Sequence, residues 1–292
     1  MATVERYDAV SRLNREWDDL ADRCGAAPWL RPGWFELWWP QFGRGRLIVL
    51  AVRRDGRLAG VLPIAARAGV CTSPANWHTP EFAPLAESDR DRDELARALL
   101  KSGGHRVELR FLDRDDRSYA ALLARAREEC WRVIDRTLEA SPYLEISGDW
   151  ESYAATRRGS FLADMRRRRR RLEERGKVTV EVRDGKERLD ELLEEGFRIE
   201  GSGWKTAHGT AITSQRETEA FYRDLARWAA ERGWLRLAFM RAEGRAVAFH
   251  FNVVFGEVHY NLKGGYDPEF ARFAPSRRPS DNTCCSKVVP MP

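Results

Sequence analysis

The sequence predicts an α/β protein made of two similar units, each with a mixed central sheet flanked by helices, of which the second is incomplete. Residues 235–275 contain three strand-like runs separated by short turns at Gly244 and Gly256, which predicts a three-strand meander. Helical and strand patterns alternate along the rest of the chain. Residues 47–64 align with residues 235–252 at a constant offset of 188, which indicates an internal repeat.

The composition is that of a globular protein with a sizeable core, since 43% of the 292 residues are hydrophobic and eleven are tryptophan. No run reaches the length of a membrane span and no apolar signal core follows the N-terminus, so we expect a cytoplasmic protein without a transmembrane segment. The five cysteines form no C-x-x-C pair, which argues against a disulfide framework or a metal site. The net charge of +5 comes almost entirely from arginine and indicates a composition bias, so a nucleic-acid partner is not expected.

The first domain is predicted over residues 1–150. It opens with a short strand near Val4, a helix that ends before Gly25 and a second helix that buries an aromatic block between residues 29 and 42, and a hairpin over residues 47–67 follows. The remaining elements are, in order, a strand near Val70, an irregular stretch at 73–87, a helix at 91–100, a strand at 105–111, a helix at 117–130 and strands at 132–138 and 143–146.

Residues 151–176 are predicted to form an arginine-rich helical connector. Six consecutive arginines at 166–171 surround the whole helix, so they cannot all face one partner. Two interpretations remain open. The arginines either belong to a solvated connector, or attract an anionic donor, a nucleotide sugar or a lipid head group.

The second domain is predicted over residues 177–275. Its elements are a strand from Val178, a helix over 189–197, a glycine-rich loop at 200–210, a helix that begins at a capping box of Ser214 and Glu217 and ends at Gly233, and the meander. The tail at 276–292 shows neither periodicity nor an apolar core and is predicted to be disordered.

The second hairpin of the meander has one apolar and one polar face. A turn at Gly256-Glu257 sets three apolar cross-strand pairs, which are Phe255 with Val258, Val253 with Tyr260 and Phe251 with Leu262. The other face carries His250, Asn252, His259, Asn261 and Lys263. Such a face is either half exposed to water or forms a wall that faces the substrate.

Several segments resemble one branch of the GNAT acyltransferase fold, whose opening order is strand, helix, loop, helix and three-strand meander. The segments are SPYLEI, FLADMRRRRRRLEERGKV, EGSGWKTAHGTAI, FYRDLARWAAERGWLRL and NLKGGYDPEFARFAP. Together they resemble the bacterial acetyltransferase family of the CelD type, associated with cellulose and exopolysaccharide biosynthesis. That family is similar in architecture to the FemAB transferases, which carry two GNAT-like domains in tandem. The resemblance covers residues 1–275.

The resemblance implies acetyl-CoA, or another acyl-CoA, as donor and an amine or hydroxyl of a sugar or cell-envelope precursor as acceptor. Catalysis then requires positioning of both substrates, removal of a proton from the acceptor and polarisation of the thioester carbonyl. By residue chemistry, Glu200 or His250 is a candidate base, and Lys205 or Tyr260 a candidate for polarising or orienting the substrate. The expected substrate-binding residues are Trp204, His208, Asn252, His259, Asn261, Lys263 and Tyr266. We expect Glu200, Lys205, His250 and Tyr260 to converge on one cleft beside the second sheet.

The sequence departs from the family after Pro275. There the family continues with a turn and a helix whose N-terminal amides hold the CoA pyrophosphate, whereas this chain continues as SRRPSDNTCCSKVVPMP. The sequence therefore predicts weak acyl-CoA binding and leaves two alternatives to acyl transfer from CoA. One is a non-catalytic GNAT-like binding module. The other is FemAB-like aminoacyl transfer from charged tRNA, in which the arginine helix would bind phosphates.

Overall fold

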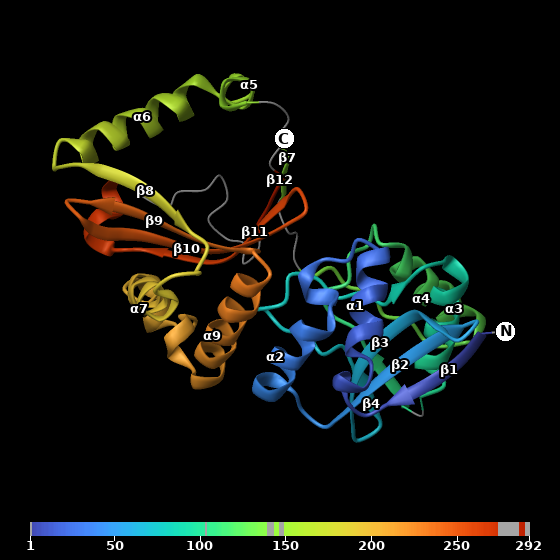
Figure 1. The fold of residues 1–292 in the computed structure, drawn as a ribbon. Helices are drawn as coiled ribbons and strands as arrows, with labels where there is room; N and C mark the ends of the chain where they lie inside the picture. The colour runs from blue at the N-terminus through green and yellow to red at the C-terminus, as the bar shows by residue number, and fades with distance from the viewer. Residues whose placement is uncertain (1, 103, 139–142, 146–148, 274–285, 290–292) are drawn as a thin grey trace. The chain divides into compact units, whose positions relative to one another are not determined.

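The computed structural model describes residues 2–102, 104–138, 143–145, 149–273 and 286–289. The chain divides into two compact units, Met1–Glu139 and Ala140–Pro292. Each is a mixed α/β unit with one sheet flanked by helices (Figure 1). None of the helices in the described part of the chain is long and apolar enough to span a membrane.

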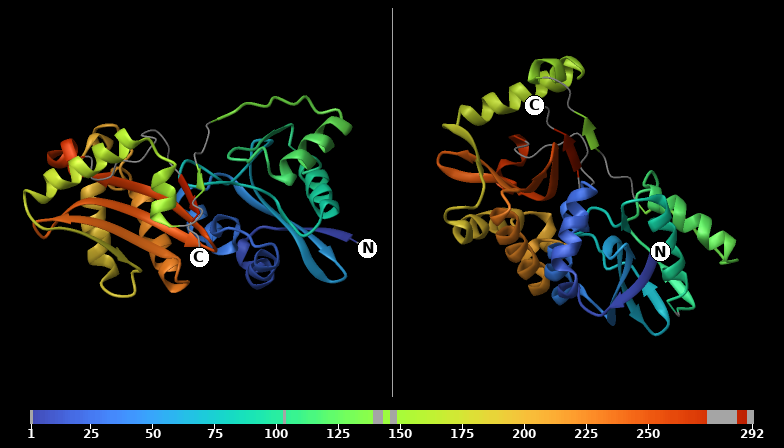
Figure 2. Two further views of the ribbon diagram at one scale, coloured as in Figure 1. Left: turned by 90° about the horizontal axis from the view of Figure 1, so that it is seen from above. Right: turned by 45° about the vertical axis from the view of Figure 1, so that its right-hand side comes forward.

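The sheet of the first unit has the order β1-β2-β3-β4-β6, with β5 pairing with β3. Neighbours are antiparallel except β4 and β6, which are parallel. The strands are β1 (Ala2–Tyr7), β2 (Arg46–Arg54), β3 (Arg57–Arg67), β4 (Val70–Thr72), β5 (Leu85–Ala86) and β6 (Arg106–Glu108). The helices are α1 (Asn14–Arg23), α2 (Pro32–Phe42), α3 (Asp89–Leu100) and α4 (Arg117–Glu128), and α1 and α3 both pack on the β2–β3 hairpin (Figure 2).

The aromatic block of the first unit belongs to its core, as predicted. Trp34 and Phe35 of α2 are buried, and the ring of Phe35 lies 5.3 Å from that of Trp17 on α1. The indole nitrogen of Trp17 donates to the carbonyl of Leu30 at 2.9 Å. A buried tryptophan thus keeps a hydrogen-bond partner while its ring packs under the sheet.

The sheet of the second unit has the order β7-β12-β11-β10-β9-β8. Only the β12–β7 pair is parallel. The strands are β7 (Tyr143–Glu145), β8 (Val178–Arg183), β9 (Leu235–Ala242), β10 (Arg245–Phe255), β11 (Val258–Tyr266) and β12 (Ser286–Val289), and the helices are α5 (Trp150–Ala155), α6 (Gly159–Glu173), α7 (Leu189–Glu200), α8 (Trp204–Ala207) and α9 (Arg216–Glu231). Figure 1 shows α7 and α9 on one face of this sheet and α6 along the other.

Two strands near the ends of the second unit correct the sequence-based expectations. Strand β7, expected to complete the first unit, belongs to the sheet of the second unit because Leu144 pairs with Val288 of β12. The tail was predicted to be disordered, but its residues 286–289 form β12, which pairs with β11. The rest of the tail from residue 276 lies outside the described residues. A strand of four residues is too short to show a period, and its partner strands lie far away in sequence.

Three further predictions also differ from the structure. The connector at 151–176 contains two helices rather than one, since α5 ends at Ala155 and α6 begins at Gly159. Residues 132–138 run without strand pairing. The predicted capping box is wrong because α9 begins at Arg216 after Gln215, with no side-chain cap, and Ser214 lies in a short 3-10 turn. The first turn of α9 instead places the carboxylates of Glu217 and Glu219 near its positive end.

The two units share local features at equivalent places in their sheets. Both open with an antiparallel strand order, β1-β2-β3-β4 and β8-β9-β10-β11. A bulge adds one residue to β3 at Ala59 and one to β10 at Val247, which are 188 residues apart like the sequence repeat. Near each bulge an arginine binds two carboxylates, one on the edge strand and one on the following helix.

The two arginine clusters have the same construction. Arg53 binds Glu5 at 2.8 Å and Glu16 at 2.5 Å. Arg241 binds Glu181 and, at 2.7 Å, Glu195. Each cluster ties the edge strand, and the helix that follows it in the chain, to the neighbouring strand of the sheet.

We expect the Arg53 cluster to make stability depend on pH. The hydroxyl of Tyr7 and the guanidinium of Arg53 lower the pKa of Glu5, and Arg53 also lowers that of Glu16. Carboxyl groups with lowered pKa stabilise the fold above their unfolded value of about 4.3 and lose this contribution as the pH falls through the folded pKa. Arg53→Met should therefore lower the free energy of unfolding by about 1 kcal/mol at neutral pH, and by less near pH 3.

Urea unfolding of the wild type and Arg53→Met at both pH values measures this difference. The control is Arg57→Met, whose side chain is 59% exposed, and which should change stability little at either pH. If the free energy of unfolding falls equally at both pH values, the effect comes from packing of the aliphatic part of the Arg53 side chain.

Candidate active site

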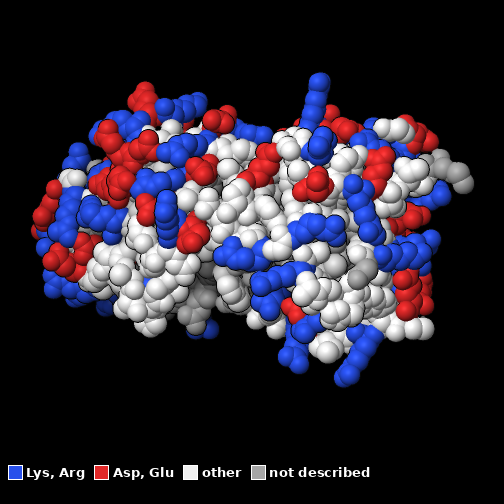
Figure 3. Space-filling model, turned by 90° about the horizontal axis from the view of Figure 1, so that it is seen from below, with Lys and Arg blue, Asp and Glu red and all other residues white. Residues whose placement is uncertain are grey.

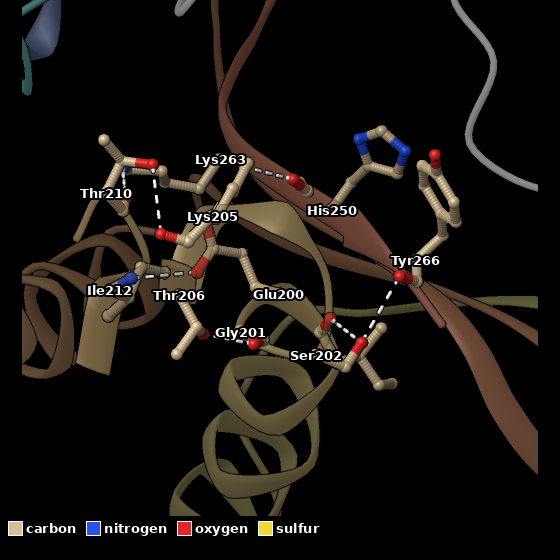
Figure 4. A network of polar contacts seen from close by, with 12 residues as sticks. Glu200, Gly201, Ser202, Lys205, Thr206, Thr210, Ile212, His250, Lys263 and Tyr266 are labelled. Carbon is tan, nitrogen blue, oxygen red and sulfur yellow. Dashed lines mark hydrogen bonds and ion pairs between the residues drawn. The ribbon is translucent and has the colours of Figure 1, made fainter. Parts of the chain in front are cut away.

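A buried ion pair closes the helix-side face of the second sheet where α7 ends. Glu200, the last residue of α7, is 1% exposed, and Lys205 of α8 donates to its Oε1 at 2.9 Å. The backbone N–H of Ile212 donates to Oε2 at 2.8 Å, so both carboxylate oxygens are engaged. Lys205 also donates to the carbonyl of Gly264 on β11 at 2.5 Å. The pair thus holds the glycine-rich loop against β11 (Figure 4).

A glycine pair in β11 permits this close approach. A Cβ on Gly265 would lie 2.6 Å from the Cα of Glu200, and one on Gly264 would lie 2.6 Å from the ring of His250. Both faces of β11 are therefore crowded at this point, and any side chain would force the end of α7 or His250 to move. The sequence showed these glycines, but only the tertiary structure shows what approaches them.

A bulge changes the predicted register of the β10–β11 hairpin. The pairs Phe255 with Val258 and Val253 with Tyr260 are confirmed, but Phe251 pairs with Lys263 because β11 gains an extra residue at that point. The insertion reverses the facing of the following residues. Lys263 therefore leaves the predicted polar face.

On the helix side, Lys263 makes a second tie to the glycine-rich loop. Its Nζ donates to the carbonyl of Thr210 at 3.1 Å and lies 5.9 Å from the ring centre of Tyr222 on α9. The side chain of Lys263 is buried, and Tyr260 faces the same side opposite the buried Val253. Lys263 and Tyr260 therefore share the helix-covered face with the Glu200–Lys205 pair.

The opposite face of the hairpin carries a connected group of His250, Asn252 and Asn261. Asn261 Nδ2 lies 2.9 Å from His250 Nδ1 and 2.7 Å from Asn252 Oδ1. Asn261 Nδ2 also donates to the carbonyl of Lys263 at 3.2 Å, and Asn252 Nδ2 donates to the carbonyl of Arg236 at 3.0 Å. Both asparagines are buried. This group will be called the Asn–His network.

The Asn–His network predicts which nitrogen of His250 carries the proton. The backbone carbonyls that accept from Asn252 and Asn261 fix both amides, because turning either amide would set its oxygen against a carbonyl oxygen. The NH₂ group of Asn261 then faces Nδ1 of His250, and an NH₂ group is a donor. This arrangement predicts that Nδ1 is the acceptor and that a neutral His250 ring carries its proton on Nε2.

The structure divides the predicted site residues between two faces of the sheet. Glu200, Lys205 and Tyr260 lie on the helix side, whereas His250 lies on the other side, as does Tyr266, whose ring stands beside that of His250 in Figure 4. The expectation that the four candidate catalytic residues meet in one cleft is therefore wrong. Tyr260 pairs with Val253, which lies three positions from His250 on β10, and positions an odd number apart on a strand point to opposite faces.

The remaining predicted residues surround these two groups. His259 pairs with Val254 and lies on the face of the Asn–His network. His208 is exposed in the glycine-rich loop, and Trp204 begins α8. The sequence reasoning did not identify three backbone groups that complete the helix-side contacts, namely the N–H of Ile212 and the carbonyls of Thr210 and Gly264. Backbone partners leave no signal in residue type.

A separate hollow of about 1180 Å³ lies between β8 and α7. Its walls include Glu181, Arg183, Glu195 and Arg241, and none of the predicted site residues lines it. Cations and carboxylates alternate around it, and Arg241 is engaged by two of the carboxylates. The hollow shows no excess of one charge that would select an ionic substrate.

Comparison with known proteins identifies one domain. Residues 159–277 match the family model described as acetyltransferase (GNAT) domain, a range that includes α6, the glycine-rich loop and the complete β8–β11 order. A crystal structure titled a conserved protein of unknown function from Bacteroides thetaiotaomicron VPI-5482 is similar over 98% of this chain and 90% of that chain, with 13% identity and a TM-score of 0.47. No curated protein matches. A GNAT domain is thus present in the second unit, and it supports acyl transfer in general.

Proposed function

We propose that the second unit transfers an acyl group, most simply acetyl from acetyl-CoA, to an amine or hydroxyl of a sugar or cell-envelope precursor. The observation that carries this proposal is the match of residues 159–277 to the GNAT acetyltransferase domain. GNAT domains generally use acyl-CoA, and the matched range holds every candidate site residue. The CelD-like resemblance of the sequence supplies the proposed acceptor class.

We also propose that the first unit descends from a second copy of the same fold. The support is the shared strand order, the bulges at Ala59 and Val247 and the two arginine clusters of like construction. The boundary between the copies then falls near residues 139–150. Residues 151–176 introduce the second copy, whose strands begin at β8.

For the reaction we propose roles that follow the two faces of the sheet. Glu200 is a positioning residue, since acting as a base would require its carboxylate to give up the contacts with Lys205 and Ile212. His250 supplies an Nε2–H donor for the thioester carbonyl, where negative charge develops in the transition state. His259, on the same face, is the candidate base for the acceptor proton, and Tyr266 borders the same site.

The remaining predicted residues take supporting roles in this proposal. Asn252 and Asn261 fix the orientation of His250 through the Asn–His network. Lys205, Lys263 and Tyr260 hold the helix-side wall. Trp204 and His208 are proposed to contact the acceptor, because they belong to the loop that these lysines anchor.

The proposal is tested by following release of the CoA thiol from acetyl-CoA in the presence of a panel of amino sugars and neutral sugars. We expect thiol release that depends on one acceptor class and that yields an acetylated product by mass spectrometry. Calorimetric titration with acetyl-CoA measures donor binding separately. Binding without release for every acceptor would favour the non-catalytic module. Transfer of the aminoacyl group from aminoacyl-tRNA to an acceptor, with release of free tRNA and no thiol release from acetyl-CoA, would favour the FemAB-like alternative.

A further inference from the structure

Helix α6 presents a group of arginines that the fold of the second unit does not use. At 3.6 residues per turn, Arg166 and Arg170 form one column and Arg167 and Arg171 the next, and all four are exposed. The opposite side of α6 holds Leu172, which is buried against Phe270 and Phe273. We call these four outward-facing residues the arginine array.

Within the described residues, three of the four arginines of the array lack an acidic partner, and the fourth, Arg167, pairs with Asp164. Asp164 binds Arg167 and Arg168, and Glu173 binds Arg169. Within the described parts of the chain, Arg166, Arg170 and Arg171 form no ion pair. Like charges one turn apart repel and destabilise a helix, so the array is costly unless an external anion neutralises it.

Many of the arginines elsewhere in the protein pair with carboxylates. Arg125 binds Asp93, and Arg223 binds Glu194 and Glu219. On the face seen in Figure 3, positive and negative side chains alternate over the second unit, at the left of the view. On α6, by contrast, exposed arginines follow one another over two successive turns of a single helix.

The chemistry of α6 fits an anionic lipid surface. Phe161, Leu162 and Met165, which are half-buried, lie on the side of the helix that carries Leu172, away from the arginine array. The apolar side of α6 packs on Phe270 and Phe273 through Leu172, so the arginines alone would meet a lipid surface, through attraction of their charge to anionic head groups. A guanidinium group also binds phosphate through two hydrogen bonds.

We propose that the arginine array docks the second unit on a membrane surface rich in anionic phospholipid. Attraction of this kind increases with each arginine near the surface, so three unpaired arginines correspond to a preference of about a hundredfold for anionic over neutral vesicles. The attraction is screened by salt. The proposal stands apart from acyl transfer and is tested without an activity measurement.

The test is sedimentation of the full chain with vesicles of phosphatidylcholine alone or mixed with phosphatidylglycerol. We expect binding only to the mixed vesicles, with loss of binding at high salt. The quadruple variant Arg166→Gln, Arg167→Gln, Arg170→Gln and Arg171→Gln should lose the preference, and glutamine keeps a high helix propensity. The same four positions changed to lysine should retain most of it, since the charge is kept.

A matched control removes the same charge from four exposed arginines of the first unit, Arg12, Arg15, Arg44 and Arg67. This control should bind mixed vesicles like the wild type, and thermal unfolding by circular dichroism checks that each variant is folded. If the control loses as much binding to mixed vesicles as the α6 variant does, net charge alone determines the binding, and the proposal is overturned. Binding of a short RNA or DNA duplex through the same arginines, without binding to mixed vesicles, would overturn it in favour of a nucleic-acid partner.

Discussion

Replacing Lys205 by methionine is expected to lower the free energy of unfolding of the second unit by about 3 kcal/mol, because removing one partner of a buried ion pair leaves an uncompensated charge. Glu200 is 1% exposed and would keep only the N–H of Ile212 as a partner. The loss should also free the glycine-rich loop, because the contact of Lys205 with the carbonyl of Gly264 disappears. Urea unfolding followed by tryptophan fluorescence measures the change.

Two further variants separate the buried charge from other effects of the substitution. In the double variant Glu200→Gln with Lys205→Met the neutral amide no longer requires a cation, so stability should recover in part compared with Lys205→Met. Lys186→Met, at a lysine whose side chain is 73% exposed, should change stability by less than about 0.5 kcal/mol. If the double variant is less stable than Lys205→Met, the carboxylate of Glu200 is not the source of the loss.

The meander shows which features of the fold follow from local sequence. The glycines at its turns have positive φ, 76° at Gly244 and 56° at Gly256, as two-residue hairpin turns require. Alternation of apolar residues then sets the pairs next to the turn, and both pairs nearest Gly256 were predicted correctly. The error begins at Phe251, where a bulge adds a residue to β11, because nothing in the alternation of residue types marks a single inserted position.

The residues of the candidate site could be predicted from the sequence, but their geometry could not. Residue chemistry identified Glu200, Lys205 and His250, and the first two form a contact. Their division between two faces depends on the packing of α7 against β11, which is a tertiary feature. Strands β7 and β12 pair across more than 140 residues of chain, which no local pattern can indicate.

The Asn–His network permits a direct spectroscopic prediction. Long-range ¹H–¹⁵N correlation of ring nitrogens should show His250 protonated at Nε2 and unprotonated at Nδ1 at neutral pH, since Nδ1 faces the NH₂ group of Asn261. Asn261→Leu removes that donor and should allow a mixture of both tautomers. His208, which is exposed in the loop, serves as the internal reference. A proton on Nδ1 of His250 in the wild type would contradict the assignment.

The largest effect on activity is expected at His250, and the kind of substitution distinguishes a donor from a base. If Nε2–H stabilises the developing oxyanion, His250→Phe should lower kcat by about a hundredfold to a thousandfold. His250→Gln places an amide N–H near the same position and should recover activity in part, whereas a glutamine cannot replace a base. CoA release measured against pH supplies the second criterion, because a base at His250 would give wild-type enzyme an acidic limb that His250→Gln lacks. Equal loss in both variants, together with that change in the pH profile, would identify His250 as the base and overturn its role as a donor.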